Sequence, residues 1–528
     1  MKTNNSFFSS LIISFCLLLQ YNFSCAQKTK WNKYYGGNHE EYLSDMIPTA
    51  DNGFILAGSS LSGKSGIKNS LNFGGLDYWI WKMDEFGEKE WEKSYGGKQD
   101  DWLSKIIKTR DGGYLLVGTS SSNIGFDKKE DAIGENDIWV LKISAMGVEQ
   151  WQKTLGGRGN EKNPTIVPTK DGYLVGASSN SAINGNKTIE NFGNYDYWIL
   201  KLNLDGEIQW QNAFGGVYYD ELISIVSSND DGFIIAGNSN SEISGNKTEK
   251  TEGLSDYWIL KIDSNGLVKW QKTYGSVKDE SLSEIIATKD KGYIIAGSSN
   301  AFEKSNELNT NFHLINIDED GTIKWEENYD YGTVDLITTI ISNQNNTYTL
   351  GGYSKGAYNI IFNKENYKKN KRDTEEYILI NLDDKGKVLW DKIIYNEGED
   401  ILKKVIVSRD NGYILAGNNN VLQNTKNINR QGNNDFWIVK VFDENQPINE
   451  LEEIIASPNP TFNYTNIVIG FPYEKGELTI NDIMGRQIKT KTVTERMIPI
   501  DLSGQAAGIY IISVKIKNEV YSVKVIKE

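Results

Sequence analysis

A carboxylate stands ten residues after each member of a regularly spaced tryptophan series, and these acids are the most obvious candidates for chemistry in the chain. They are Glu41, Asp101, Glu161, Asp220, Glu280, Asp335 and Asp400. Two interpretations are open. An acidic ring at the mouth of a channel would bind cations or an amine-bearing ligand. Alternatively, each acid accepts hydrogen bonds from backbone N–H groups where one repeat passes into the next. A role repeated in every unit favours the structural interpretation.

A denser acidic segment, "FDKKEDAIGEND", lies in the second repeat. Its Asp127, Glu130 and Asp131 carry the hard oxygen ligands that calcium prefers, but their spacing is irregular and lacks the order of an EF-hand loop. Calcium is therefore a weak prediction, and no other cofactor is expected. The D-x-x-G tetrapeptides elsewhere, such as Asp84 to Gly87, are predicted to be tight turns rather than metal loops.

Catalytic motifs are scarce in this sequence. His39 and His313 are its two histidines, and it contains no nucleophile elbow, phosphate-binding loop or metal-ligand pair. Adjacent carboxylates such as Asp100 and Asp101 are of the type used in glycoside hydrolysis, so a polysaccharide-cleaving hydrolase or lyase is the alternative function. That chemistry depends on the separation of two carboxyl groups in space, which the sequence does not give.

Function is expected where the repeats differ, because residues common to all of them are needed to build a repeat. Trp102 and the pair Tyr218–Tyr219 are aromatic departures that lie next to Asp101 and Asp220 in the segments connecting repeats. Large flat rings with a polar edge suit the stacking of a sugar. These residues are the predicted binding site for an extracellular glycan or protein.

Repeated strands must position these side chains. The tryptophans recur at spacings of 55 to 65 residues, at Trp31, Trp91, Trp151, Trp210, Trp270, Trp325 and Trp390. Each unit contains four runs rich in β-branched and aromatic residues, separated by Asp, Asn and Gly, which predicts four antiparallel strands. The pattern predicts an all-β, seven-bladed β-propeller. Apolar residues sixteen positions after each tryptophan are expected to pack between blades: Ile47, Ile107, Val167, Val226, Ile286, Ile341 and Ile406.

The two ends of the array favour a closed ring over an open stack. A tryptophan-bearing strand at Lys30 to Tyr35 precedes the first hairpin, whereas none follows "DFWIVKV" in the last repeat. We therefore expect the N-terminal strand to complete the last blade. The long Asn-, Ser- and Gly-rich loops then fall on the same face as the connections between repeats. This face is the predicted interaction surface.

Composition and the N-terminus indicate an exported protein. Residues 1–26 resemble a secretory signal, with an apolar run too short to span a bilayer and cleavage after Ala26; acylation of Cys25 is the alternative. Both cysteines lie in this segment, which excludes disulfides and thiol catalysis from the mature chain. The net charge of −15 argues against nucleic acid and anionic membranes as partners. No later stretch is long and apolar enough to form a transmembrane segment.

The C-terminal part of the chain has a different pattern. The propeller is assigned to residues 27–445, a linker to 446–456 and a separate domain to 457–528. Apolar and polar residues alternate over several runs of this last domain, which indicates a small antiparallel β-sandwich. Its distinctive residues are Pro458, Asn459, Pro460, Gly485, Arg486, Asp501, Gly508, Tyr510 and Lys524.

These ordered motifs resemble the C-terminal sorting domain of the Bacteroidetes type IX secretion system. The resemblance implies that this secretion machinery is a partner and that the passenger is released or attached to the cell surface. The repeat region is similar to bacterial β-propeller passengers of such domains, which implies a fold but no activity. The expected function is therefore adhesion or binding outside the cell, with a glycan or a protein as ligand.

Overall fold

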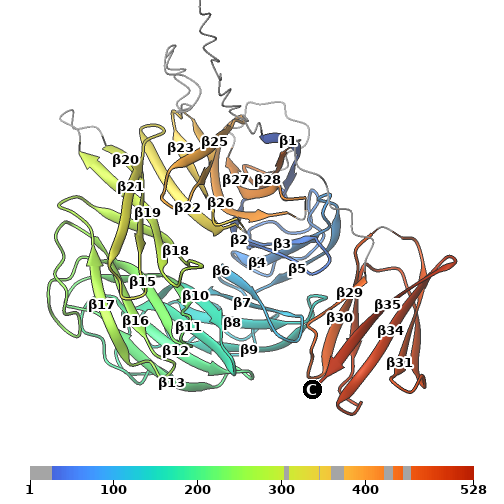
Figure 1. Ribbon diagram of the computed structural model, residues 1–528. Coiled ribbons are helices and arrows are strands. Elements are labelled where there is room, and N and C mark those ends of the chain that lie inside the picture. The colour runs from blue at the N-terminus through green and yellow to red at the C-terminus, as the bar shows by residue number, and fades with distance from the viewer. Residues whose placement is uncertain are drawn as a thin grey trace, which may run out of the picture.

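The computed structural model describes residues 27–302, 308–343, 345–357, 374–408, 410–420, 432–443, 454–471 and 473–528. Strands, turns and loops make up these residues, and no helix occurs among them. Four-stranded antiparallel sheets follow one another through the repeat region in the manner of propeller blades, and two further sheets form the C-terminal domain (Figure 1). The predicted signal segment and most of the predicted linker lie outside the described residues.

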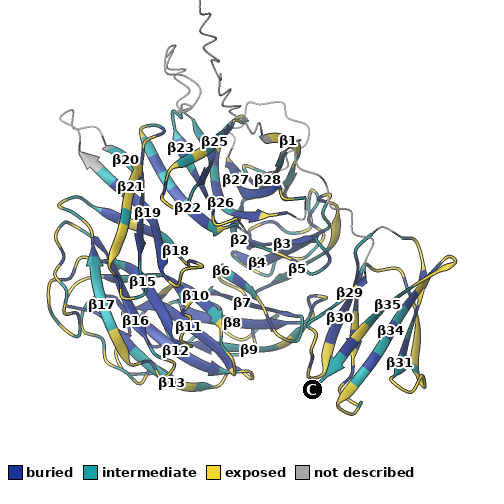
Figure 2. Cartoon of the chain, in the orientation of Figure 1, coloured by how far each residue is buried: buried dark blue, intermediate teal, exposed yellow. Residues whose placement is uncertain are grey.

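Each sequence repeat contributes four strands, which we call first to fourth in chain order. The four strands differ in how far their residues are buried. First strands alternate buried and more exposed residues. Second and third strands are buried along nearly their whole length because neighbouring sheets cover both of their faces. Fourth strands form the exposed edge of each sheet (Figure 2).

The strand bounds recur with the sequence repeat. The first strands are β2 (Glu41–Pro48), β6 (Asp101–Lys108), β10 (Glu161–Pro168), β14 (Asp220–Ser227), β18 (Glu280–Ala287), β22 (Val334–Ser342) and β26 (Glu399–Val407). The second strands are β3 (Phe54–Ser60), β7 (Tyr114–Ser120), β11 (Gly172–Ser179), β15 (Phe233–Ser239), β19 (Tyr293–Phe302), β23 (Tyr348–Lys355) and β27 (Tyr413–Asn420).

The remaining strands of the repeat region continue this order. The third strands are β4 (Asp77–Met83), β8 (Asp137–Ile143), β12 (Asp196–Asn203), β16 (Asp256–Ile262), β20 (Leu308–Ile317), β24 (Glu375–Leu382) and β28 (Asn434–Asp443). The fourth strands are β5 (Lys89–Tyr95), β9 (Glu149–Leu155), β13 (Ile208–Phe214), β17 (Val268–Tyr274), β21 (Ile323–Tyr329), β25 (Val388–Ile394) and, from the N-terminus, β1 (Gln27–Tyr35).

The N-terminal strand belongs to the sheet of the last repeat. That sheet has the order β1-β28-β27-β26, and β1 is antiparallel to β28, with Tyr35 opposite Phe436. The sheets of the fifth and sixth repeats are joined into one of eight strands by a single parallel pair, Thr310 and Val334. Isolated parallel bridges such as Tyr195 with Tyr219 occur at equivalent places between other repeats. Neighbouring sheets are thus linked at each of these crossings.

The hydrophobic core is divided into clusters that lie between neighbouring sheets. In one of them, Ile80 of β4 packs with Leu103 and Ile106 of β6. The prediction that the residues sixteen positions after each tryptophan pack between sheets is confirmed. Each of these residues belongs to such a cluster: Ile47, Ile107, Val167, Val226, Ile286, Ile341 and Ile406.

The repeated tryptophan fastens a fourth strand to the sheet of the next repeat. The Trp31 ring lies against Gly87, where an added Cβ would come within 3.2 Å of it. Gly87 has a φ of +78°, so glycine serves both the turn and the close approach. Tyr35 donates a hydrogen bond to the Gly87 carbonyl oxygen at 2.6 Å. The same packing recurs in Trp91–Gly147, Trp151–Gly206, Trp210–Gly266 and Trp325–Gly386.

The D-x-x-G segments are turns, as the sequence predicts. Asp84 accepts hydrogen bonds on Oδ1 from the N–H groups of Phe86 and Glu88, both at 2.8 Å. These turns and those after the first strands define the turn face. The loops between second and third strands, with the connections between repeats, define the long-loop face.

The C-terminal domain consists of two antiparallel sheets around their own core. One sheet contains β29 (Ile454–Ser457), β30 (Tyr464–Ile469) and β33 (Met497–Asp501). The other contains β31 (Gly476–Asp482), β32 (Gln487–Val493), β34 (Gly508–Ile516) and β35 (Glu519–Lys527). Ile467, Ile480 and Ile512 lie in a single core cluster to which both sheets contribute side chains. This is the small sandwich that the sequence predicts.

Candidate functional site

The predicted carboxylates lie where one repeat passes into the next. Asp101 and Asp220 are fully buried. Asp101 accepts hydrogen bonds on Oδ2 from Gly97 N at 2.7 Å and Ser122 Oγ at 3.1 Å. The Asp220 Oδ2 atom accepts from Gly216 N at 2.7 Å and from Ser241 Oγ at 2.9 Å. A catalytic acid must reach its substrate, and in this conformation the two carboxylates instead hold the backbone of the connections between repeats.

A second buried acid, from the start of a third strand, lies beside each of these two carboxylates. Burial, with the nearby Asp101 charge, raises the pKa of Asp77 to about 7. Burial and the Asp220 charge raise the pKa of Asp196 to about 6. Oδ1 of each of these four side chains is buried without a hydrogen-bond partner. The same pairing of acids occurs in Asp435–Glu41, Asp137–Glu161 and Asp256–Glu280.

The predicted aromatic residues are exposed on the long-loop face. Trp102 is 40% exposed and packs against Tyr42, with the two rings tilted by 46° and 5.1 Å between their centroids. Tyr219 is 47% exposed and stacks on Tyr195 at 5.9 Å. Tyr218, beside it, is also exposed.

Lys162 lies beside the second of these aromatic pairs. It occupies the same position in β10 as Trp102 in β6, eleven residues after the repeat's tryptophan, and its Nζ lies 4.4 Å from the Tyr195 ring centroid. We call Tyr42, Trp102, Lys162, Tyr195 and Tyr219 the aromatic arc. Sequence analysis found Trp102 and Tyr219 but not their partners, which lie in other repeats or in a distant part of the same one.

The long loops of the first four repeats are anchored by a lysine that the sequence analysis missed. Lys187 Nζ donates to the carbonyl oxygens of Ser181 at 2.9 Å and Ile189 at 2.8 Å, and to Asn191 Oδ1 at 2.7 Å. Each such lysine lies 5.3 to 5.9 Å from the centre of a tryptophan ring, in Lys68–Trp79, Lys128–Trp139, Lys187–Trp198 and Lys247–Trp258. A constant spacing of eleven residues between lysine and tryptophan was the available signal.

The acidic segment proposed as a weak calcium site has protein partners. Asp131 Oδ1 accepts a hydrogen bond from Ile124 N at 2.9 Å, and Glu130 Oε2 accepts one from Thr154 N. Burial raises the pKa of Asp127. Within the described residues, no group of three or more His, Cys, Asp or Glu side chains is arranged to hold a metal ion.

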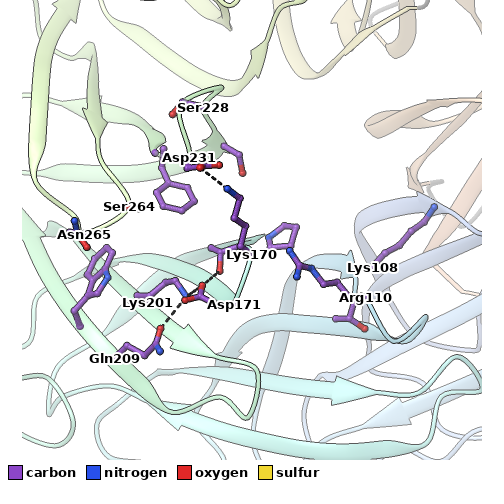
Figure 3. Close-up of a pocket in the computed structure, with 17 residues that line it drawn as sticks. Lys108, Arg110, Lys170, Asp171, Lys201, Gln209, Ser228, Asp231, Ser264 and Asn265 are labelled. Carbon is purple, nitrogen blue, oxygen red and sulfur yellow. Dashed lines mark hydrogen bonds and ion pairs between the residues drawn. The ribbon is translucent and has the colours of Figure 1, made fainter. Parts of the chain in front are cut away.

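A cleft of about 920 Å³ opens on the turn face, between the turns of the second, third and fourth repeats. Figure 3 shows Lys108 and Arg110 at one end of it, Asn265 at the other and Lys170 between them. Lys170 pairs with Asp231 at 2.6 Å, and Lys201 pairs with Asp171 at 2.7 Å. Sequence analysis placed its candidate surface on the opposite face and did not indicate this cleft.

The distinctive residues of the C-terminal domain form turns and hydrogen bonds between separate segments of the domain. Asn459 donates to the Lys524 carbonyl oxygen at 2.6 Å and accepts from Ile526 N at 2.8 Å, which ties the Pro458–Pro460 segment to β35. Gly485, with φ +80°, and Arg486 form the turn after β31. Asp501 accepts from Ser503 N at 2.8 Å, Gly508 begins β34, and Tyr510 donates to the Ala506 carbonyl oxygen at 2.6 Å.

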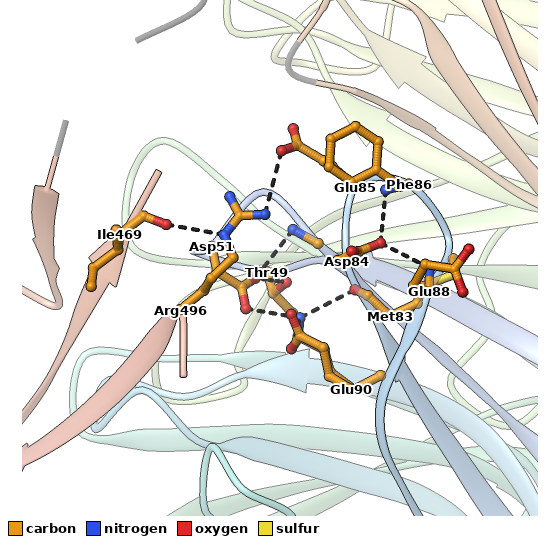
Figure 4. A network of polar contacts seen from close by, with 12 residues as sticks. Thr49, Asp51, Met83, Asp84, Glu85, Phe86, Glu88, Glu90, Ile469 and Arg496 are labelled. Atoms are coloured by element: carbon orange, nitrogen blue, oxygen red, sulfur yellow. Dashed lines mark hydrogen bonds and ion pairs between the residues drawn. The ribbon is translucent and has the colours of Figure 1, made fainter. Parts of the chain in front are cut away.

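The C-terminal domain contacts the turn face of the first and second repeats. Arg496 donates from Nε to the Ile469 carbonyl oxygen at 3.1 Å, and its Nη1 lies 3.4 Å from Glu85 Oε1 (Figure 4). Val468 and Met497 pack with Ala145 in a small apolar cluster. Nothing in the sequence indicated this contact, because it joins residues from separate domains.

Comparison with known proteins identifies the last domain. Residues 457–528 match the family model of the secretion system C-terminal sorting domain. The domain indicates export by type IX secretion to the cell surface or extracellular space, and it implies an interaction with that secretion machinery. Within the described residues, no helix has the length and apolar character needed to cross a membrane.

The chain is also similar, at low sequence identity, to several other proteins. The regulatory protein FlaEY of Caulobacter vibrioides is 24% identical over 211 residues, which are 37% of this chain and 22% of that protein, so the chain spans about a fifth of its length. A puromycin hydrolase aligns with a TM-score of 0.43 and 10% identity over 90% of this chain and 59% of that one. A fungal alcohol oxidase of the AA5 family aligns with a TM-score of 0.40 and 8% identity over 95% and 99%.

Proposed function

We propose that the protein is a secreted or surface-attached seven-bladed β-propeller that binds an extracellular glycan through its long-loop face. Ring closure is supported by the contacts of the first strands, which run in a cycle from β2 through β6, β10, β14, β18, β22 and β26 back to β2. Core clusters support it as well, since Phe436 of β28 packs with Trp79 of β4. Removing residues 27–35 would leave β28 without its outer neighbour, so we expect the shortened chain to melt at a lower temperature.

The aromatic arc is the observation that favours a glycan. Its exposed rings, Trp102 and Tyr219, rest on Tyr42 and the buried Tyr195, on the face where buried lysines hold the long loops, so the surface is ordered before a ligand arrives. Aromatic faces stack on the C–H-rich faces of sugars, and a preformed surface binds at a smaller entropic cost. Other exposed apolar side chains on the same loops, including Ile124, Phe126 and Leu254, extend this surface. Such patches mark interaction sites.

A glycan array probed with the full-length chain tests the proposal. Trp102→Ala and Tyr219→Ala are each expected to weaken binding by roughly tenfold, since an aromatic stacking contact is worth about 0.5–1.5 kcal/mol beyond the area it buries. Phe86→Ala is the control, because Phe86 is an exposed aromatic residue on the turn face. A parent protein that binds no glycan on the array, or variants that bind as the parent does, would refute the proposed function.

A further inference from the structure

The cleft on the turn face concentrates positive charge in a strongly acidic protein. The chain has a net charge of −15. The cleft nevertheless has four cationic side chains, Lys108, Arg110, Lys170 and Lys201, against two acidic ones, Asp171 and Asp231, which leaves a local charge of +2. A cationic cleft on an anionic surface attracts anionic ligands in preference to neutral ones.

Two of these cations are available to a ligand. Lys170 and Lys201 are engaged with Asp231 and Asp171. Lys108 and Arg110 are exposed, and neither has an ion pair or a side-chain hydrogen bond within the described part of the chain. They line the same end of the cleft, two residues apart in one turn (Figure 3).

Comparison among the repeats shows that Lys108 is not needed to build a repeat. It stands seventeen residues after Trp91. The corresponding positions in the other repeats are uncharged: Pro48, Pro168, Ser227, Ala287, Ser342 and Val407. Lys201 differs in this respect, because Lys82, Lys142 and Lys261 hold the equivalent position and make equivalent ion pairs with turn acids. A cation found in a single repeat is better explained by a ligand than by folding.

We propose that this cleft binds the anionic groups of an acidic saccharide, with Lys108 and Arg110 as the residues that contact its charge. An arginine guanidinium matches the two oxygens of a carboxylate or sulfate, and a lysine adds a mobile point charge. Gln209, Ser228 and Asn265 add amide and hydroxyl groups along the cleft for sugar hydroxyls. The volume of about 920 Å³ is within the range of about 300–1,000 Å³ found for small-molecule sites.

The proposed cleft is separate from the aromatic arc. The arc lies on the long-loop face, whereas every turn that lines the cleft lies on the turn face. The sorting domain sits beside the cleft, since Arg110 also borders a cavity of about 430 Å³ that is shared with Phe462 and Tyr464. Ser228 and Asn265, at the other end of the cleft, do not line that cavity.

Calorimetric titration of the full-length chain tests this site. The probes are oligogalacturonate for carboxylate, dextran sulfate for sulfate, unmodified dextran as the neutral control, and inorganic phosphate for a free anion. We expect binding of a charged saccharide, none of unmodified dextran, and affinity that falls as salt rises. The charged saccharide that binds more tightly shows whether the cleft prefers carboxylate or sulfate groups. Binding of phosphate alone, of dextran equally, or of no probe would overturn the proposal.

Matched variants separate this site from general electrostatic attraction. Lys108→Gln with Arg110→Gln is expected to weaken binding by roughly tenfold, as for the loss of two exposed charge contacts. Lys289→Gln with Lys291→Gln removes the same charge from the equivalent turn of the fifth repeat and should change affinity less than about twofold. Equal losses in both variants would refute a specific site. Trp102→Ala should leave this binding intact, so failure here is distinguishable from failure of the aromatic arc.

Discussion

Lys404 and Glu284 form an ion pair, with 2.6 Å between Nζ and Oε1, although they are 120 residues apart and belong to the seventh and fifth repeats. Both stand fourteen residues after the tryptophan of their repeat, where the first strand departs from regular pairing. Asp45 and Lys105 hold the corresponding positions in the first two repeats. Burial and the Lys404 charge lower the pKa of Lys105. Two acids and two bases therefore meet where the first strands converge.

Glu284→Gln should destabilise the repeat region. It removes the partner of Lys404 and leaves Lys404 beside Lys105, so an uncompensated positive charge remains in a mostly buried place. We expect a loss in free energy of unfolding on the order of 2 kcal/mol, measured by urea unfolding followed by tryptophan fluorescence. The double variant Glu284→Gln, Lys404→Gln should lose less than Glu284→Gln alone. If the single variant unfolds at the parent's urea midpoint, the pair contributes nothing to stability.

The buried acids at the junctions between repeats should make stability fall as pH rises between 5 and 8. The pKa values of Glu41, Asp77 and Asp335 are raised to about 7, and those of Asp196 and Asp256 to about 6, in each case mainly by burial. In the unfolded chain these groups titrate near 4. Their contribution is therefore complete below about pH 4 and is lost as pH rises through 6 to 7.

Acids in the turns make stability fall at low pH. Asp111, for example, has a lowered pKa because Lys142 and nearby hydrogen bonds outweigh its burial, so its contribution is lost in strong acid. We expect the highest melting temperature near pH 5 and a fall of several degrees by pH 8, measured by calorimetry at constant ionic strength. A melting temperature that rises steadily from pH 5 to 8 would contradict this.

Asp77→Asn tests the contribution of one junction. Asp101, Lys68 and Asp127 are the charged groups around Asp77, and an amide in its place needs no proton to stay neutral. The chain already has Asn311 at the equivalent position, opposite Ser299 as Asp77 is opposite Ser60. The variant should fold and show a flatter decline between pH 5 and 8 than the parent. An unchanged slope would show that Asp77 does not take up the proton.

The sequence predicts features that recur and misses those that depend on the arrangement of distant repeats. The four strands per repeat, the pairing of β1 with β28 and the interior apolar positions follow from periodicity, because identical local patterns give identical strands. The ion pairs Lys404–Glu284 and Arg496–Glu85 do not follow from periodicity. Each joins residues that are far apart in the sequence and become neighbours only in the folded chain. For the proposed sites, the sequence analysis named Trp102 and Tyr219 as candidates, which stay predictions, and it did not name Lys108, although Lys108 differs in type from the residues at its position in the other repeats.

Lys187→Met should loosen the long loop of the third repeat. The ammonium group donates to three oxygen atoms, one in a buried and two in partly buried hydrogen bonds, and methionine would fill the space but remove this donor. We expect a cost of about 1–3 kcal/mol in the free energy of unfolding. Faster hydrogen exchange at Lys187 and Thr188 should accompany it. Lys64→Met, at an exposed position in the loop of the first repeat, is the control and should change neither quantity.

Arg496→Ala should release the sorting domain from the turn face without unfolding either part. The side chain links the Ile469 carbonyl oxygen to Glu85, and the surrounding apolar cluster of Val468, Met497 and Ala145 is small. Another polar contact between the domains is a long hydrogen bond of 3.4 Å from Asn466 Nδ2 to the Gly112 carbonyl oxygen, so losing the bridging arginine should shift the equilibrium towards separated domains.

Small-angle X-ray scattering provides the measurement for Arg496→Ala. We expect a larger maximum dimension and radius of gyration than in the parent, with an unchanged melting temperature of the repeat region. Arg486→Ala is the control, because Arg486 is exposed in the turn after β31 and pairs within its own turn with Asp482 at 3.0 Å. If Arg496→Ala scatters as the parent and Arg486→Ala do, the apolar cluster and the Asn466–Gly112 hydrogen bond hold the domains together without Arg496.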